Sequence, residues 1–388
     1  MAEKDKRPIV FFGTVTHFGG SEKSTVALIV ELKKTCDVIV LDVSGCCTEY
    51  INELEKLGIT YEIIFPKAKN IIIGGSSRIS RLWRVIIASG ENRQIVRRLR
   101  RKLEDINPRA ICINFQKSMF YVGRAVGKRF PTLMFVRIGY QKLKWYCLKD
   151  WRNLGVIVGN NSNTLKFFEK FDWARNKLAV AYNGIDFDAI QKVEAALKNL
   201  PGQHLSLKIV MPATLIPLKA HSVAIKGFAR FCRSHNDCVM WICGDTPNNL
   251  TRDYENSLHE LCRRLGITDK VHFLGWCSNV PAIMKLADIM VLTSETEGLP
   301  RSVLEAMALG LPVIATKVGG ITEVIRNDVD GILIDVGDDD AVAAALERLQ
   351  IAEIRHKMGL AGQQRIKTEF SIRGQADVFL KLINKIAS

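Results

Sequence analysis

The chain has 388 residues, of which 47% are hydrophobic and 24% are charged, and its formal net charge is +15. This length exceeds what one hydrophobic core usually organises, so we expect two domains, and the composition excludes a disordered or fibrous protein. No apolar run is long enough to cross a bilayer, and the first residues lack the pattern of a signal peptide, so we expect a cytoplasmic protein.

Short apolar runs alternate with amphipathic helical stretches through the first half of the chain. The expected strands are residues 9–14, 37–42, 61–65, 110–114, 132–136 and 156–160. Helices are expected over residues 22–34 and 49–57. Short buried strands that alternate with helices indicate a parallel sheet covered on both faces.

The second half of the chain repeats this arrangement after a polar breaker at residues 201–204. The expected strands are residues 208–211, 239–243, 271–273, 289–292, 312–315 and 331–334. We therefore predict an α/β protein with one doubly wound domain over residues 1–200 and a second over residues 201–370. A C-terminal helix within residues 371–388 completes the chain, and packing against the first domain is one option for it.

The segment between residues 287 and 324 contains two successive strand–loop–helix units. Loops at the carboxyl ends of parallel strands face the crevice in which α/β proteins bind ligands. Gly298 allows close backbone approach, Pro300 suits a first helical turn, and the exposed N–H groups of such a turn attract anions. Glu297 lies on this loop and Glu305 follows on the helix. Two carboxylates beside backbone donors suit a ligand with hydroxyls and phosphates, although Glu305 alone could equally complement the helix dipole.

The stretch EGLPRSVLEAMALGLPVIAT, which places Glu297 and Glu305 in an E-x7-E spacing, resembles the signature of glycosyltransferase family 4. This resemblance implies a retaining enzyme with the GT-B fold, in which two Rossmann-like domains face each other across a cleft. Further similarities extend over nearly the whole chain, at Gly19-Gly20, at residues 183–186, around Lys219, at Gly244 and at Gly319-Gly320.

The same resemblance implies roles for individual residues. Glu305 would bind the ribose of a nucleotide, and Glu297 would bind the hydroxyls of the donor sugar. The diphosphate would be held by Lys219 and by the backbone of Gly298 and Leu299. Gly19 and Gly20 would close over the diphosphate from the other domain, and Thr214 and Gly244 would also line the donor site.

Two positions depart from the family pattern. Thr214 stands where the family usually has an arginine, and Arg137 stands where it has a histidine on the acceptor side. The loss of one cation should weaken diphosphate binding and leaving-group stabilisation. We expect Arg137 or another basic residue to compensate, so the predicted catalytic residues are Glu297, Lys219 and Arg137.

These observations favour a metal-independent transferase that needs no cofactor and moves a hexose-type sugar from a UDP- or GDP-linked donor to an acceptor hydroxyl. A lipid-linked or polysaccharide acceptor would place the reaction in cell-envelope synthesis. Two alternatives stay open: a sugar-nucleotide epimerase of similar fold, and a degenerate transferase that only binds nucleotide sugars or nucleic acid. The acidic run at residues 338–340 precedes an Ala-rich stretch and predicts a helix N-cap rather than a metal site.

Positive charge concentrates between residues 67 and 102, where eleven Lys or Arg residues accompany one acid. Apolar residues, among them Ile95, Leu99 and Leu103, interleave with these cations, and a second cluster covers residues 142–146. Basic, apolar segments of this kind lie at anionic membrane surfaces. We favour a peripheral position at the inner face of the membrane over a solvated helix face, and either of these over nucleic-acid binding.

Overall fold

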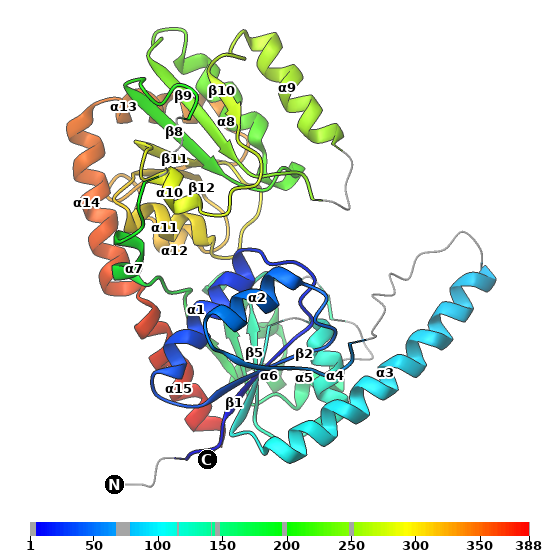
Figure 1. Cartoon of the computed structure of the whole chain (residues 1–388). Coiled ribbons are helices and arrows are strands. Elements are labelled where there is room, and N and C mark those ends of the chain that lie inside the picture. The colour runs from blue at the N-terminus through cyan, green and yellow to red at the C-terminus, as the bar shows by residue number, and fades with distance from the viewer. Residues whose placement is uncertain are drawn as a thin grey trace. The chain divides into compact units, whose positions relative to one another are not determined.

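The computed structural model describes residues 5–66, 78–114, 116–140, 142–143, 148–195, 200–247 and 252–387, with backbone alone for residues 78–89 and 116–117. Much of the two expected basic clusters, at residues 67–77 and 144–147, therefore lies outside the described residues. The chain forms two compact units, one comprising Met1–Tyr182 with Arg373–Ser388 and the other Asn183–Ile372. Each unit is a parallel α/β domain (Figure 1).

The described strands of the first unit form a parallel sheet in the order β3-β2-β1-β4-β5-β6-β7. Their bounds are β1 (Ile9–Gly13), β2 (Val38–Asp42), β3 (Thr60–Ile63), β4 (Ala110–Ile113), β5 (Thr132–Val136), β6 (Val156–Gly159) and β7 (Leu178–Val180). The six strands expected from the sequence are confirmed. Strand β7 was not predicted, because it is a three-residue edge strand whose residues are all half-buried.

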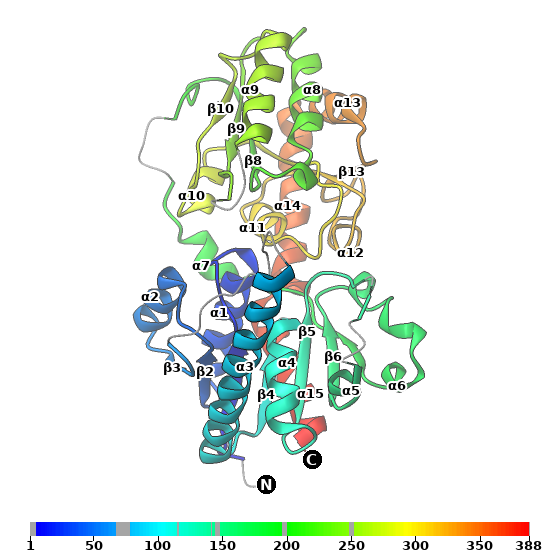
Figure 2. The ribbon, with the colours of Figure 1, turned by 90° about the vertical axis from the view of Figure 1, so that its right-hand side faces the viewer.

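Helices cover both faces of this sheet (Figures 1 and 2). They are α1 (Gly20–Lys33), α2 (Thr48–Lys56), α3 (Arg78–Ile106), α4 (Gln116–Val126), α5 (Leu148–Arg152), α6 (Asp172–Arg175) and α15 (Ile372–Ala387). Side chains of a strand alternate between the two faces. On β5, Met134 joins the core that contains Leu99 of α3 and Val122 of α4, whereas the ring of Phe135 lies 5.0 Å from that of Phe379 on α15.

The second unit begins at Asn183, eighteen residues before the boundary expected from the sequence. Asn183 donates a 2.9 Å hydrogen bond from Nδ2 to the carbonyl of Leu299, and Ile185 forms a parallel bridge with Ser371. The segment that the sequence assigned to the end of the first domain is therefore tied to the second. Helix α7 (Phe187–Gln191) follows directly in this second unit.

The second unit contains a parallel sheet in the order β10-β9-β8-β11-β12-β13. The strand bounds are β8 (Leu207–Pro212), β9 (Cys238–Cys243), β10 (Val271–Phe273), β11 (Ile289–Leu292), β12 (Val313–Thr316) and β13 (Ile332–Ile334). The helices are α8 (His221–Phe231), α9 (Asp253–Leu265), α10 (Val280–Met284), α11 (Arg301–Ala308), α12 (Ile321–Val324), α13 (Asp339–Leu349) and α14 (Ala352–Glu369). All six strands expected here are present, and the strand order changes direction between β8 and β11.

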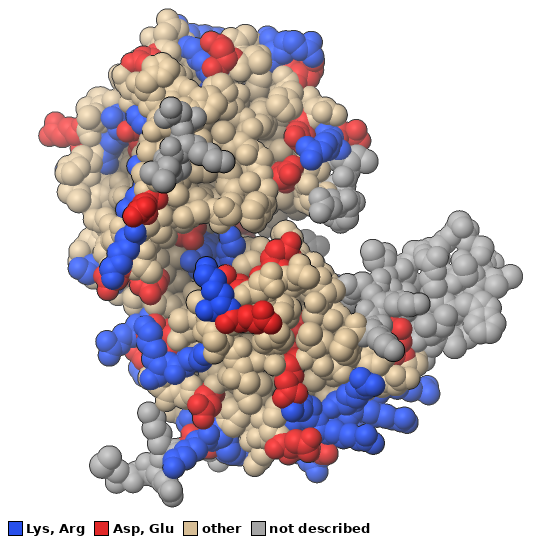
Figure 3. Space-filling model, in the orientation of Figure 1, with Lys and Arg blue, Asp and Glu red and all other residues tan. Residues whose placement is uncertain are grey.

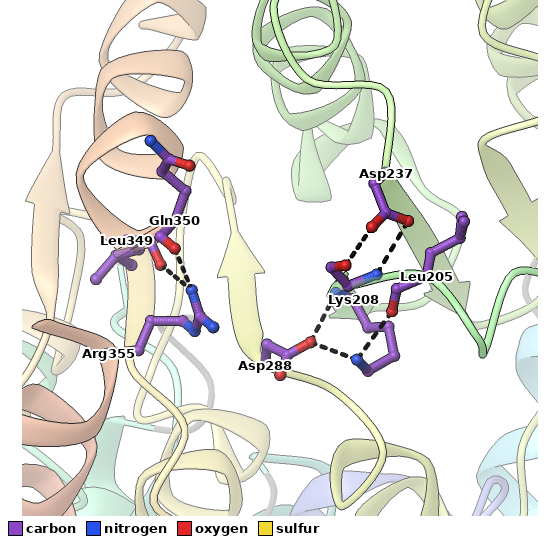
Figure 4. A network of polar contacts seen from close by, with 8 residues as sticks. Leu205, Lys208, Asp237, Asp288, Leu349, Gln350 and Arg355 are labelled. Atoms are coloured by element: carbon purple, nitrogen blue, oxygen red, sulfur yellow. Dashed lines mark hydrogen bonds and ion pairs between the residues drawn. The ribbon is translucent and has the colours of Figure 1, made fainter. Parts of the chain in front are cut away.

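Polar contacts close the amino edge of this second sheet (Figure 4). The ammonium of Lys208 on β8 lies 2.9 Å from Oδ2 of Asp288, which directly precedes β11. The same carboxylate oxygen accepts a 2.8 Å hydrogen bond from the Lys208 backbone N–H. Nearby, Arg355 caps the end of α13 by donating 2.7 Å hydrogen bonds to the carbonyls of Leu349 and Gln350. These contacts fix the ends of neighbouring elements to one another.

Helix α3 exposes arginines and buries its apolar residues in the part whose side chains are described. Ile95, Leu99 and Leu103 belong to the core of the first unit, so they are not available to a membrane, contrary to our interpretation of the interleaved pattern. Arg93, Arg97 and Arg101 follow at helical spacing and are exposed. Figure 3 shows Lys and Arg side chains gathered over the C-terminal part of α3.

Two further expectations concern helix ends and membrane spans. The Asp338 side chain accepts a 2.8 Å hydrogen bond from the backbone N–H of Ala341, which confirms the predicted N-cap of α13. Within the described ranges, no helix has the length and apolar character needed to span a membrane.

Candidate functional site

The candidate site lies at the carboxyl edge of the second sheet, where β8 and β11 diverge. In open α/β sheets, ligands bind at such a change of strand direction. Lys219 lies in the short turn after β8, and Glu297 lies in the loop after β11. The Lys219 ammonium is 2.6 Å from Oε1 of Glu297. The sheet topology thus brings together the two side chains that the sequence predicted to be catalytic in this unit.

A buried serine also contacts the Glu297 carboxylate. Ser294 is fully buried, and its hydroxyl donates a 2.7 Å hydrogen bond to Oε1 of Glu297. Its carbonyl accepts a 2.6 Å hydrogen bond from the hydroxyl of Thr316 at the end of β12. Oε1 therefore has two donors in this structure. The sequence analysis missed Ser294, although its position directly after a buried strand could have drawn attention to it.

The backbone of the Glu297 loop rests on the loop after β12. Gly319 has a φ of +53°, and a Cβ added there would lie 1.8 Å from the carbonyl oxygen of Glu297, so only glycine fits. The N–H of Gly320 donates a 2.6 Å hydrogen bond to the carbonyl of Gly298. Together with the Asn183 contact to Leu299, these bonds fix the backbone conformation of residues 297–299 just before α11.

Glu305 lies on α11 and is 9% exposed. Its Oε1 accepts a 2.6 Å hydrogen bond from Nε of Arg301, the first residue of the same helix. The sequence analysis did not single out Arg301, since an arginine at the start of a helix resembles an ordinary surface residue. The structure instead pairs it with the carboxylate that was predicted to bind ribose.

The other predicted donor residues of this unit have different surroundings. Thr214 is exposed in the turn after β8. Gly244 follows β9, and a Cβ added there would lie 1.9 Å from the carbonyl oxygen of Ala213. Packing between the ends of β8 and β9 therefore already requires glycine at this position, whether or not a ligand approaches it.

His221 begins α8, two residues after Lys219, and its side chain is fully buried. Burial lowers the pKa of this imidazole to about 4, so the ring is neutral at pH 7. Nε2 lies 3.3 Å from the carbonyl oxygen of Ala213, and Nδ1 lies 3.4 Å from the Tyr254 hydroxyl. The ring thus makes local hydrogen bonds that fix the turn containing Lys219.

In the first unit, the predicted residues lie at the carboxyl ends of β1 and β5. Gly19 is the N-cap of α1, and its N–H donates a 3.0 Å hydrogen bond to Oε2 of Glu22, while Gly20 is the first helical residue. Arg137 is buried, donates a 2.8 Å hydrogen bond from Nη2 to the Thr25 hydroxyl, and lies with its guanidinium carbon 4.3 Å from the Phe135 ring centroid. The roles predicted for these residues toward a donor or acceptor stay predictions.

Among the residues that the structure describes, no group of three or more His, Cys, Asp and Glu side chains has an arrangement that could hold a metal ion. The carboxyl edge of the second sheet thus offers a cation, two carboxylates and a backbone loop, a set suited to an anionic ligand with hydroxyl groups.

A known protein family matches within this second unit. Residues 198–365 match the family model of the glycosyl transferases group 1. The lipopolysaccharide core biosynthesis glycosyltransferase LpsD of Rhizobium meliloti (strain 1021) is 28% identical over 204 residues, which are 52% of this chain and 58% of LpsD. The UDP-Gal:alpha-D-GlcNAc-diphosphoundecaprenol alpha-1,3-galactosyltransferase of Escherichia coli is 29% identical over 210 residues, 52% of either protein. The chain therefore spans about half the length of these curated relatives.

Solved structures match both units. The crystal structure of Anabaena HepE in complex with UDP has a TM-score of 0.79 to this chain at 19% identity, and the match covers 97% of this chain and 100% of that one. At this identity the likeness shows the fold, which is the two-domain GT-B architecture.

The fold is that of the GT-B architecture, as in the solved neighbours. Within the second unit, residues 198–365 match the family model of the glycosyl transferases group 1. This assignment is consistent with the resemblance to family 4, which the group 1 model does not specify.

Proposed function

We propose that this chain is a retaining, metal-independent glycosyltransferase that moves a hexose-type sugar from a UDP- or GDP-linked donor to an acceptor hydroxyl. The observation that carries the proposal is the arrangement of Lys219 and Glu297 at the carboxyl edge of the second sheet, 2.6 Å apart beside the start of α11. A UDP complex and a UDP-glucose complex are known for the structural neighbour HepE, which supports a nucleotide-sugar donor.

In this proposal the second unit binds the donor. Lys219 and the backbone of Gly298 and Leu299 hold the diphosphate, and Glu305 accepts hydrogen bonds from the ribose. Since Lys219 already pairs with Glu297, donor entry exchanges this contact: the ammonium turns to the diphosphate, and the released carboxylate oxygen accepts from a sugar hydroxyl. The buried Ser294 hydroxyl keeps Glu297 in place during the exchange.

The proposed reaction breaks the bond between the anomeric carbon and the diphosphate and forms a bond from that carbon to the acceptor oxygen on the same face. The acceptor proton passes to the departing diphosphate, and Lys219 stabilises the negative charge that develops there. Arg137 of the first unit is proposed to act on the acceptor side. Positioning and charge stabilisation supply the rate gain without an enzyme nucleophile.

We further propose a lipid-linked or polysaccharide acceptor of the cell envelope, handled at the cytoplasmic face of a membrane. LpsD is named for lipopolysaccharide core biosynthesis and the Escherichia coli relative for a diphosphoundecaprenol substrate. The exposed stripe of Arg93, Arg97 and Arg101 on α3 supports attraction to anionic lipids. Because the apolar side of this helix segment is buried, the attraction we propose is electrostatic and should weaken with salt.

A thermal-shift screen across nucleoside diphosphates and their sugars tests the donor class, since a ligand that binds only the folded protein raises its melting temperature. We expect UDP or GDP and the matching hexose conjugate to stabilise the protein, and to do so equally in EDTA. Incubation of the stabilising donor with a lipid-linked acceptor should then give a product that keeps the donor's anomeric configuration by NMR. An epimerised donor in the absence of acceptor, or no stabilisation by any nucleotide, would reject the proposal.

A further inference from the structure

The pair formed by Arg301 and Glu305 on α11 is unfavourable for the helix that contains it. Arg301 is the first residue of α11, and no acidic residue lies in that first turn. The amino end of a helix carries a partial positive charge, so a cation there is repelled. The order of the pair, with the cation four residues before the carboxylate, is also the weaker of the two possible orders on a helix.

The guanidinium of Arg301 is incompletely satisfied as well. Its Nε donates to Oε1 of Glu305 at 2.6 Å, whereas Nη1 is buried and has no hydrogen-bond partner among the described residues. A buried donor without a partner costs free energy that an aliphatic side chain at this position would not incur. Helix stability and hydrogen bonding therefore both argue against arginine at residue 301.

Residues that violate several local preferences at once, as Arg301 does, concentrate at functional sites. Arg301 stands four residues after Glu297, and the carboxylate that it contacts is the one proposed to bind the donor ribose. Both side chains are largely shielded: 22% of the Arg301 side chain and 12% of the Glu305 side chain are exposed. Their contact is therefore better shielded from solvent than an ion pair on the open surface of a helix.

We propose that Arg301 is a positioning residue that orients Glu305 for the ribose hydroxyls of the donor. By holding Oε1, the guanidinium leaves Oε2 to accept from the vicinal hydroxyls, and it keeps the carboxylate in one rotamer. This inference rests on the proposed function, and it gives this chain a specificity determinant for ribose that lies outside the E-x7-E pair itself.

Isothermal titration with two nucleotides tests the proposal. The probes are the diphosphate that the wild type binds, UDP or GDP, and the 2′,3′-dideoxy form of the same nucleotide. We expect the wild type to bind the ribonucleotide about tenfold more tightly than the dideoxy form. In Arg301→Met this preference should fall below about threefold, through weaker binding of the ribonucleotide alone, and Arg301→Lys should restore part of it.

A second arginine–carboxylate pair provides the matched control. Arg326 donates from Nε to Oδ2 of Asp330 at 2.5 Å, with the same four-residue spacing, in the turn before β13. Arg326→Met should keep the wild-type preference for ribose. Melting temperatures of all three variants verify that each is folded.

The possible outcomes distinguish a failure of the role of Arg301 from a failure of the proposed function. A folded Arg301→Met variant that keeps the tenfold preference, or loses affinity equally for both nucleotides, overturns the role of Arg301. Neither result affects the proposal that the second unit binds the donor. A wild type that binds without preference for the ribose overturns the role of Glu305 and, with it, that of Arg301. A wild type that binds neither UDP nor GDP rejects the proposed function and this inference together.

Discussion

The two edges of the second sheet carry similar lysine–carboxylate pairs with different consequences. At the amino edge, Lys208 lies 2.9 Å from Asp288, and the same carboxylate oxygen also accepts from the Lys208 backbone. At the carboxyl edge, Lys219 lies 2.6 Å from Glu297, between loops rather than between strand ends. The first pair joins the start of β8 to the residue that precedes β11. The second lies where the strands diverge and the loops can admit a ligand.

The contrast teaches that contact distance alone does not distinguish a structural ion pair from a functional one. What differs is the surrounding backbone. The amino-edge pair is held by strand ends, whereas the carboxyl-edge pair stands beside the uncapped start of α11 and a loop that only glycine at residue 319 permits. Matched substitutions at the two edges therefore test whether only the Lys219–Glu297 pair is functional.

The largest effect is expected from Glu297→Ala compared with Asp288→Asn. If Glu297 holds the sugar in the transition state, its removal should lower kcat about 100-fold or more. Asp288→Asn should lower the melting temperature but change the kcat of the folded protein less than about twofold, since it lies at the opposite edge. Steady-state kinetics on both variants, corrected for folded fraction, measure the difference. Equal losses of kcat would show that the Lys219–Glu297 and Lys208–Asp288 pairs contribute equally to catalysis.

A smaller effect is expected for the cations. Lys219→Met should weaken nucleoside diphosphate binding about tenfold or more, because a charge-assisted hydrogen bond to phosphate is lost. Lys208→Met should leave that affinity unchanged. Calorimetric titration of both variants provides the comparison, and unchanged binding by Lys219→Met would remove this lysine from the donor site.

The pH dependence of stability should report the burial of His221. Its folded pKa of about 4 lies below the unfolded value near 6.5, so the unfolded state binds the proton more readily between these values. Stability should therefore be fully present above about pH 6.5 and decrease as pH falls toward about 4, by up to roughly 3 kcal/mol. His221→Gln should flatten this part of the curve in denaturant titrations from pH 7 to pH 4. An unchanged slope in the variant would assign the loss to other groups.

The smallest effect is expected from adding a cation at the exposed Thr214. If the diphosphate lies near this turn, Thr214→Arg should strengthen nucleotide binding by up to about fivefold, as exposed ion pairs contribute at most about 1 kcal/mol. Added salt should abolish the gain. Weaker binding by this variant would indicate that the turn lies away from the phosphates or that the longer side chain blocks them.

The sequence predicted much of this fold because short buried strands of parallel sheets are continuous apolar runs. All six strands of the second unit and six of the first were expected, and the exception, β7, is a short edge strand that is only half-buried. The domain boundary was misplaced because the polar breaker at residues 201–204 is a local signal. The true division depends on long-range contacts such as that of Asn183 with Leu299, which no local pattern reveals.

The site residues that belong to a sequence motif could be predicted. The site residues that are brought in by tertiary contacts could not. Glu297 and Lys219 followed from the resemblance, and the topology brings them into contact. Ser294 and Arg301 were missed, since the sequence does not show that the serine is buried or that the arginine contacts Glu305. The interpretation of the basic segment as a membrane-binding surface was partly wrong for the same reason, because Ile95, Leu99 and Leu103 of α3 belong to the core.

The donor site can be located by a crystal structure of the chain with the nucleoside diphosphate that stabilises it. We expect the diphosphate to lie against Lys219 and the N–H groups at the start of α11, the ribose hydroxyls to lie at Glu305, and the contact between Lys219 and Glu297 to be broken. A nucleotide bound elsewhere, with the 2.6 Å contact between Lys219 and Glu297 intact, would contradict this expectation.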